Sequence, residues 1–261
     1  MLFNSLDFLL FFPIVCLLFF GLPQKFRWLM LLVASCYFYM YFIPIYILIL
    51  AGTIVIDYFA GILIEQNHGK RRRFYLIVSL FANIMVLAVF KYYNFFAASF
   101  AEMFTSIGFK TSPILLNVIL PVGISFYTFH GLSYVIDIYK DKIKVERNFI
   151  DYSLFVSFFP LLVAGPIERA THLLPQIKKK RTFDFTYAAD GLRQILWGLF
   201  KKIVIADNCA IYANAIFNDS ANHDGSSLFL GAIFFTFQIY GDFSGYSDIA
   251  LGTSRLFGIE L

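Results

Sequence analysis

The side chains best suited to chemistry lie in one strip, residues 238–248, directly after the apolar run 228–237. Its amide, carboxylate and hydroxyl groups belong to Gln238, Asp242, Ser244, Tyr246 and Asp248. Ionisable groups within a membrane are costly, so they usually face a bundle interior or a water-filled cavity and mark function. Two interpretations stay open. The strip lines a substrate tunnel, or it is a buried hydrogen-bonded network that holds helices together.

A second candidate is His130, which lies inside an apolar segment and has the side chain best suited to general-base work near neutral pH. Ser133, Tyr134 and Asp137 follow at three, four and seven positions, so in a helix they share its face. A histidine that packs helices by bonding a backbone carbonyl explains the same pattern, so both roles stay open. The remaining histidines fall in loops, where we expect them to be solvated: His68, His172 and His223.

Several other chemistries are excluded by the absence of their motifs. The sequence has no phosphate-binding loop, metal-ligand cluster or dinucleotide fingerprint, and Gly241–Gly245 lacks the spacing of a nucleophile elbow. The cysteines Cys16, Cys36 and Cys209 fit neither a disulfide framework nor a zinc site. We therefore expect no metal and no bound cofactor.

The composition is that of a membrane protein. Hydrophobic residues make up 59% of the chain and charged residues 15%, against roughly 45–50% and 25% in soluble proteins. Long, continuous apolar runs predict an all-α, polytopic transmembrane bundle that forms one membrane-embedded domain over residues 1–261. We expect segments near 6–22, 29–43, 45–64, 74–96, 114–137, 150–167, 192–216 and 227–257. The first lacks the features of a cleavable signal peptide, so it is expected to stay in the protein.

The charges predict an orientation. Basic residues cluster at 25–27, 70–73 and 140–147, whereas the turn at Pro44 and the loop at 97–113 are nearly neutral. Under the positive-inside rule the N-terminus lies outside and the basic loops lie in the cytoplasm. The modest net charge of +4 is confined to loops, so it indicates topology and not nucleic-acid binding.

The sixth segment breaks this alternation, because basic loops flank it on both sides, at 140–147 and 169–181. It contains Pro160 and Gly165-Pro166, and its uninterrupted apolar run, 154–164, is shorter than the ~20 residues of a span. We infer a re-entrant segment around a cavity open to the cytoplasm, because irregular backbone at membrane depth must be buried or line a cavity. A simple broken transmembrane helix is the alternative.

The stretch 183–217 mixes charges with apolar residues. Arg193 and Lys201 lie near one helical face, which predicts an amphipathic helix at the cytoplasmic interface with Trp197 as an anchor. Its charges, including Lys202, are expected to form a solvated face. The run Lys178–Arg181 serves as a topology signal or attracts an anionic lipid or an acidic carrier protein.

Several stretches together resemble one family, the membrane-bound O-acyltransferases, in their bacterial alginate O-acetylase-like branch. The opening 1–11 and four further stretches carry the resemblance, in the right order over essentially the whole chain: 120–139, 155–167, 198–207 and 237–250.

The resemblance implies a curved helical bundle with re-entrant segments and a tunnel through the bacterial inner membrane. Acetyl-CoA or another acyl thioester would donate an acyl group on the cytoplasmic side. The acceptor would be an exported polysaccharide such as alginate, reached with the help of an extracytoplasmic acetyltransferase partner. Within this frame, Asp242, Ser244, Tyr246 and Asp248 would shape the tunnel wall or orient helices around it.

Two departures from the family pattern matter. The family's essential histidine lies in a Trp-His pair well downstream of the 242–248 stretch, so it is expected beyond Leu261, and no catalytic residue is assigned within this chain. Gly241 falls where many relatives carry a larger residue, which predicts a locally wider cavity. The alternatives are transfer of D-alanine from a carrier protein to teichoic acid, or an inactive truncated membrane scaffold.

Overall fold

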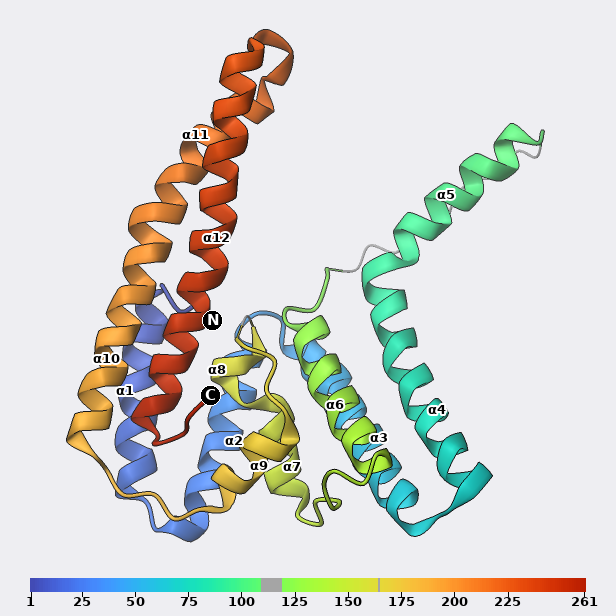
Figure 1. Ribbon diagram of the computed structural model, residues 1–261, viewed down its shortest axis with the longest axis vertical. Coiled ribbons are helices and arrows are strands. Elements are labelled where there is room, and N and C mark those ends of the chain that lie inside the picture. The colour runs from blue at the N-terminus through green and yellow to red at the C-terminus, as the bar shows by residue number, and fades with distance from the viewer. Residues whose placement is uncertain (109–118, 164) are drawn as a thin grey trace.

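The computed structural model describes residues 1–108, 119–163 and 165–261, and every regular element in these ranges is a helix (Figure 1). The α-helices are α1 (Leu6–Gly21), α2 (Gln24–Met40), α3 (Ile47–Gln66), α4 (Gly69–Leu87), α5 (Tyr93–Ser106), α6 (Ile124–Tyr139), α7 (Phe149–Ser157), α8 (Phe159–Leu162), α9 (Ala170–Lys178), α10 (Phe185–Leu199), α11 (Asp207–Asn218) and α12 (Gly225–Leu256). Short 3₁₀ helices occupy Pro44–Tyr46 and Ser220–Asn222, and π-helices occupy Ala88–Tyr92 (η2) and Phe200–Ala206 (η3). The all-α prediction is confirmed.

Within the described residues, two helical stretches are long and apolar enough to cross a membrane. They are Pro44–Gln66 and Gly69–Ser106, with mean hydropathies of 2.4 and 2.1. The second is continuous through η2, so helix occupies much of the loop expected at 97–113. The rest of that loop and the start of the segment expected at 114–137 fall on 109–118, outside the described residues. Ala164, at the end of the run 154–164, lies outside them too.

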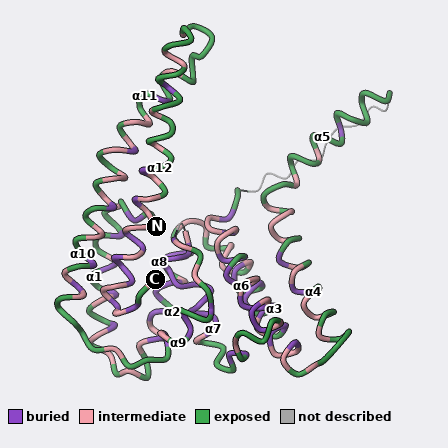
Figure 2. Tube along the Cα trace, viewed as in Figure 1, coloured by how far each residue is buried: buried purple, intermediate pink, exposed green. Residues whose placement is uncertain are grey.

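The core is dominated by aromatic rings from segments far apart in the sequence. Phe159 of α8 packs against Phe38 of α2, with ring centroids 5.4 Å apart, and against Phe257 after α12, 6.0 Å apart. Phe257 also meets Phe12 and Phe19 of α1 edge to face. Figure 2 shows this buried centre, from which the ends of α5, α11 and α12 project as exposed arms. Burial of these aromatic rings is a main source of the stability of this core.

The helix interruption expected within the segment 150–167 is present in the structure. α7 begins after Asn148, whose side chain accepts a hydrogen bond from Ile150 N, and it ends at Phe158, where the backbone is no longer helical. After α8, the chain turns back towards α9 (Figure 1). Every residue from 152 to 162 is buried, whereas Phe149 and Ile150 at the start of α7 are exposed. The backbone that leaves helical geometry at Phe158 is therefore enclosed by other helices, as it must be at membrane depth.

The connections that carry the basic clusters lie at one end of the molecule, the lower end in Figure 1. Ion pairs join several of these connections. Arg72 Nη2 lies 2.6 Å from Asp141 Oδ1, Arg147 Nη2 lies 2.5 Å from Glu65 Oε2, and these pairs are largely exposed. Glu65 Oε1 also accepts a hydrogen bond from Val145 N. The pairs therefore fix the loop after α6 against the turn between α3 and α4.

α10, η3 and α11 form one long helical stretch that runs antiparallel to α12, with glycines along the seam (Figure 1). A Cβ added at Gly191 would lie 2.7 Å from Gly252 O, and one added at Gly198 would lie 2.6 Å from Gly245 O. Such close backbone approach is the usual role of small residues between membrane helices. Gly241 belongs to the same seam, since a Cβ there would lie 3.0 Å from Lys201 O. The expected widening of a cavity at Gly241 is therefore wrong, because the missing side chain lets two helices meet.

The seam predicts a specific loss of stability. Gly252→Ala should lower the free energy of unfolding by about 2 kcal/mol, because the added methyl group overlaps the backbone of α10 and Ile195. Gly52→Ala in α3 is the matched control, since a Cβ there meets nothing within 4 Å. We expect that variant to gain up to ~1 kcal/mol from helix propensity. Unfolding by SDS titration in mixed micelles measures both, and equal effects of the two substitutions would exclude a close-packed seam.

Candidate functional site

The polar strip of α12 meets two consecutive lysines of the π-helix η3. Lys201 Nζ lies 2.5 Å from Asp248 Oδ2 and donates a hydrogen bond to Ser244 Oγ at 2.8 Å. Gln194 Nε2 of α10 donates to the other oxygen of Asp248 at 3.3 Å. The side chains of Lys201 and Asp248 are only 13% and 17% exposed. This is an ion pair between neighbouring helices in a poorly solvated place.

The second lysine makes a parallel set of contacts. Lys202 Nζ lies 2.5 Å from Asp242 Oδ1 and 2.7 Å from Asp207 Oδ1. It also stands over the ring of Tyr246, 5.9 Å from the centroid, and that ring packs against Phe3. The expected solvated face on this stretch is therefore wrong for Lys201 and Lys202. Their side chains turn towards α12, because the glycine seam brings the two helices close and the opposing face carries carboxylates.

The π-helix geometry of η3 helps to explain how both Lys201 and Lys202 reach α12. Neighbouring residues of an α-helix point about 100° apart, and the wider turn of a π-helix reduces this angle, which favours both lysines facing α12. A π-turn is a wider turn, and such turns are frequent at functional sites. The strip expected from sequence thus forms one cluster, in which two ammonium groups face three carboxylates. The amide oxygen of Gln238, one turn above Asp242, is buried without a hydrogen-bond partner among the described residues.

His130 and Asp137 lie apart from this cluster, on α6. His130 is fully buried, accepts a hydrogen bond from Glu168 N at 3.3 Å and packs against Phe155 of α7. It therefore links α6 to the chain that follows the interrupted segment, which is the geometry of a packing histidine. Asp137 is buried at the end of α6, and its Oδ1 lies 4.0 Å from Lys142 Nζ. The structure does not bring these residues to the strip on α12.

A further polar cluster joins α3, α4 and α6, and we did not predict it from sequence. Asp57 is 2% exposed, and its Oδ1 accepts hydrogen bonds from Ser79 Oγ at 2.6 Å and Asn83 Nδ2 at 2.7 Å. Its other oxygen occupies the space that a Cβ at Gly131 would need. The available signal was a lone carboxylate within the apolar segment 45–64. The partners could not be read from sequence, because they come from a different helix.

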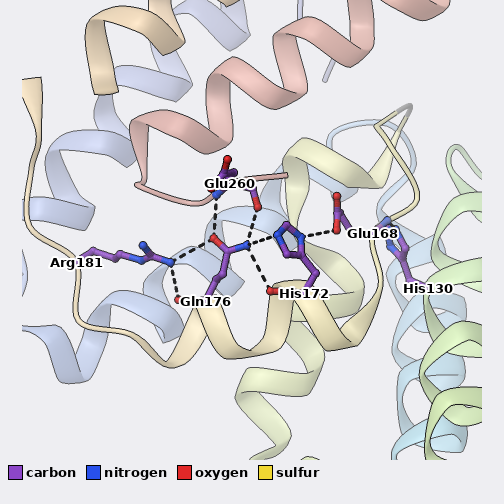
Figure 3. Close-up of polar contacts among 6 residues, drawn as sticks. All are labelled: His130, Glu168, His172, Gln176, Arg181 and Glu260. Atoms are coloured by element: carbon purple, nitrogen blue, oxygen red, sulfur yellow. Dashed lines mark hydrogen bonds and ion pairs between the residues drawn. The ribbon is translucent and has the colours of Figure 1, made fainter. Parts of the chain in front are cut away.

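At the end that carries the basic connections, a chain of polar contacts runs along α9 (Figure 3). Glu168 Oε2 lies 2.9 Å from His172 Nδ1, and His172 Nε2 faces Gln176. Gln176 holds the backbone of Glu260 with a pair of hydrogen bonds, Nε2 to Glu260 O at 2.7 Å and Glu260 N to Oε1 at 2.9 Å. Arg181 Nη2 donates to Gln176 O at 3.1 Å. His172 was expected in a loop, but it lies on a helix with a carboxylate partner.

Three hollows are associated with these elements, and one of about 440 Å³ lies on α12 and includes Ser244. A polar cavity of about 570 Å³ is lined by residues of α9, the segment 179–184 and the segment 258–260. A larger groove of about 700 Å³ is almost entirely apolar and lies between α1 and the helix formed by α10 and η3. Among the described residues, no group of His, Cys, Asp and Glu side chains could hold a metal ion.

The comparisons with known proteins find similar acyltransferases, and the match to one of them covers the whole chain. The probable alginate O-acetylase of Pseudomonas aeruginosa is 38% identical over 263 positions, which cover 100% of this chain and 50% of that protein. The peptidoglycan O-acetyltransferase of Helicobacter pylori is 36% identical and matches 89% of this chain and 48% of its own length. The teichoic acid D-alanyltransferase of Bacillus subtilis is 28% identical over 55% of this chain. No family model matches the sequence. The chain spans about half the length of the curated relatives it matches.

Proposed function

Because this chain belongs to the alginate O-acetylase branch of the membrane-bound O-acyltransferase family, we propose that it is part of an enzyme that transfers acetyl groups to hydroxyl groups of an exported glycan. One observation carries the proposal. Relatives named for O-acetylation of two different glycans match this chain at 36–38% identity. Alginate and peptidoglycan share the class of acceptor, a sugar hydroxyl outside the cytoplasm, so we propose that class and no particular polymer.

We place the protein in the bacterial inner membrane as a multi-pass protein with its N-terminus outside. The gathering of the basic connections at one end of the helices supports this orientation (Figure 1), because cytoplasmic loops carry the excess of lysine and arginine. The segment 149–169 then enters from the cytoplasmic side and returns to it. Its enclosure by α2, α3 and α6 is what a re-entrant segment requires.

In this orientation an acyl thioester such as acetyl-CoA donates on the cytoplasmic side, and an extracytoplasmic acetyltransferase partner delivers the group to the glycan. The resemblance to the family implies that the general base is a histidine outside this sequence. His130 is fully buried and accepts a hydrogen bond from Glu168 N, which fits a packing role. The cluster on α12 orients helices around the tunnel. Transfer of D-alanine to teichoic acid is the weaker alternative, because that relative matches little more than half of this chain.

Asp242 gives the test of this proposal. Asp242→Ala, introduced into the gene in its host, should lower O-acetylation of the exported glycan about tenfold, a loss of ~1.4 kcal/mol in transition-state stabilisation. Insertion should persist, because Lys202 keeps Asp207 as a partner. Ester content of the purified glycan and the amount of protein in the membrane are measured together. Arg147→Ala is the control, since it removes an exposed ion pair far from the cluster.

The proposed function and the proposed role of Asp242 are tested by different results. Glycan from wild-type cells that carries no O-acetyl ester beyond that of a deletion strain would exclude the function. Full acetylation in the Asp242→Ala strain would leave the function in place and exclude a role for this carboxylate in the tunnel.

A further inference from the structure

The polar cavity on α9 is lined by cations that form no ion pair with any described residue. Lys179 and Lys180 line it, and the described residues offer neither of them an ion pair. Their neighbour Lys178 differs, because its Nζ lies 2.6 Å from Glu146 Oε2 and it does not line the cavity. Of three consecutive lysines, the one outside the cavity is neutralised and the two that line it are not.

Arg181, also on the cavity wall, is a guanidinium without a carboxylate. Its Nη2 donates only to the backbone oxygen and the amide oxygen of Gln176, at 3.1 and 3.4 Å. Its Nε is buried and has no hydrogen-bond partner among the described residues. Burial lowers the pKa of Arg181 from its ordinary value, and the interaction with Tyr187 offsets only part of that effect. A guanidinium in such a place is usually completed by a planar or tetrahedral oxyanion.

Two acidic residues, Asp184 and Glu260, also line the cavity. Asp184 caps α10, where its Oδ1 accepts a hydrogen bond from Tyr187 N at 3.1 Å. Glu260 is held through its backbone by Gln176, and the residue itself is exposed. Glu168 is paired with His172. The three cationic side chains of the lining, Lys179, Lys180 and Arg181, therefore outnumber its two carboxylates, and the cavity keeps a net positive charge.

We propose that this cavity is a phosphoanion-binding site, in which the ammonium groups of Lys179 and Lys180 and the guanidinium of Arg181 bind phosphate oxygens. A phosphate group of this kind could belong to a nucleotide-bearing acyl donor or to an anionic lipid headgroup. The donor as source rests on the proposed function, and it fits because the cavity lies at the end that carries the basic connections (Figure 1). A volume of about 570 Å³ admits a diphosphate with part of its organic substituent.

The experiment measures binding to the full chain in nanodiscs of phosphatidylcholine, which carries no net charge. Radiolabelled coenzyme A is the probe, and pantetheine, which lacks phosphate, is the matched ligand. The variant is Lys179→Gln/Lys180→Gln. Its control is Lys70→Gln/Arg71→Gln, an exposed basic pair at the same end of the molecule and outside the cavity. In parallel, native mass spectrometry from mixed-lipid nanodiscs measures how much phosphatidylglycerol stays bound.

We expect coenzyme A to bind, pantetheine not to bind, and the cavity variant to bind coenzyme A at least tenfold more weakly than the control variant. If coenzyme A does not bind but the cavity variant alone loses retained phosphatidylglycerol, the site is a phosphoanion site for lipid. If neither ligand distinguishes the cavity variant from the control variant, the inference is wrong. That result would not affect the proposed O-acetylation of glycan, which is tested by the ester content of the glycan. The two proposals can therefore fail separately.

Discussion

Gly123→Ala is expected to lower the free energy of unfolding by about 4 kcal/mol, enough to prevent recovery of folded protein from the membrane. Gly123 has a φ of +74° at the start of α6, and an added Cβ would overlap the backbone oxygen of Leu162. The left-handed conformation alone costs an alanine roughly 1–2 kcal/mol. The remainder comes from the overlap, which cannot be relieved by a rotamer change because the partner is backbone at the end of α8.

Gly108→Ala separates the two contributions. Gly108 has a φ of +96°, and a Cβ there meets nothing within 4 Å. We expect that variant to lose only the conformational part, about 1 kcal/mol. SDS titration in mixed micelles compares the two, with the yield of monodisperse protein as a second readout. Equal losses would mean that α8 does not press against the start of α6, and the enclosure of the interrupted segment would need to be reconsidered.

Lys201→Met is expected to lower the free energy of unfolding by about 3 kcal/mol, because it leaves Asp248 charged in a place where it is only 17% exposed. Gln194 continues to donate to one oxygen of Asp248, but a neutral amide does not replace the lost charge. The double variant Lys201→Met/Asp248→Leu should recover most of the loss. A buried ion pair often stabilises a protein no more than a well-packed apolar pair does. Removal of one partner, in contrast, leaves a buried charge without its counter-charge and lowers stability strongly.

An exposed pair supplies the contrast. Arg147→Met removes the partner of Glu65, but the side chain of Arg147 is 62% exposed, so we expect a change below ~1 kcal/mol. Unfolding free energies of the single and double variants form a cycle that isolates the coupling between Lys201 and Asp248. A Lys201→Met protein as stable as Arg147→Met would show that water reaches the cluster on α12. The cluster would then be part of an open aqueous tunnel and not a closed helix contact.

Much of the fold follows from local pattern. The apolar runs predicted helices, Pro44 predicted the turn between α2 and α3, and Pro160 with Gly165-Pro166 predicted the interruption of 149–169, all of which the structure contains. Each depends on residues adjacent in the chain. The orientation in the membrane and the re-entrant path stay predictions. Both depend on which side of a bilayer the basic loops occupy, and helix packing alone does not define that side.

The strip at 238–248 could be picked out from sequence as a candidate, because residue type and position along an apolar helix are visible there. The sequence by itself determined which groups are present and that they sit in an apolar segment. The tertiary structure alone decided their partners. Lys201 and Lys202 pair with α12 because glycines seven apart on two helices interlock, and Lys179, Lys180 and Arg181 share a cavity because the segment 258–260 closes it. Such pairings join residues distant in sequence, and only the packing of helices places a charge beside its counter-charge or leaves it without one.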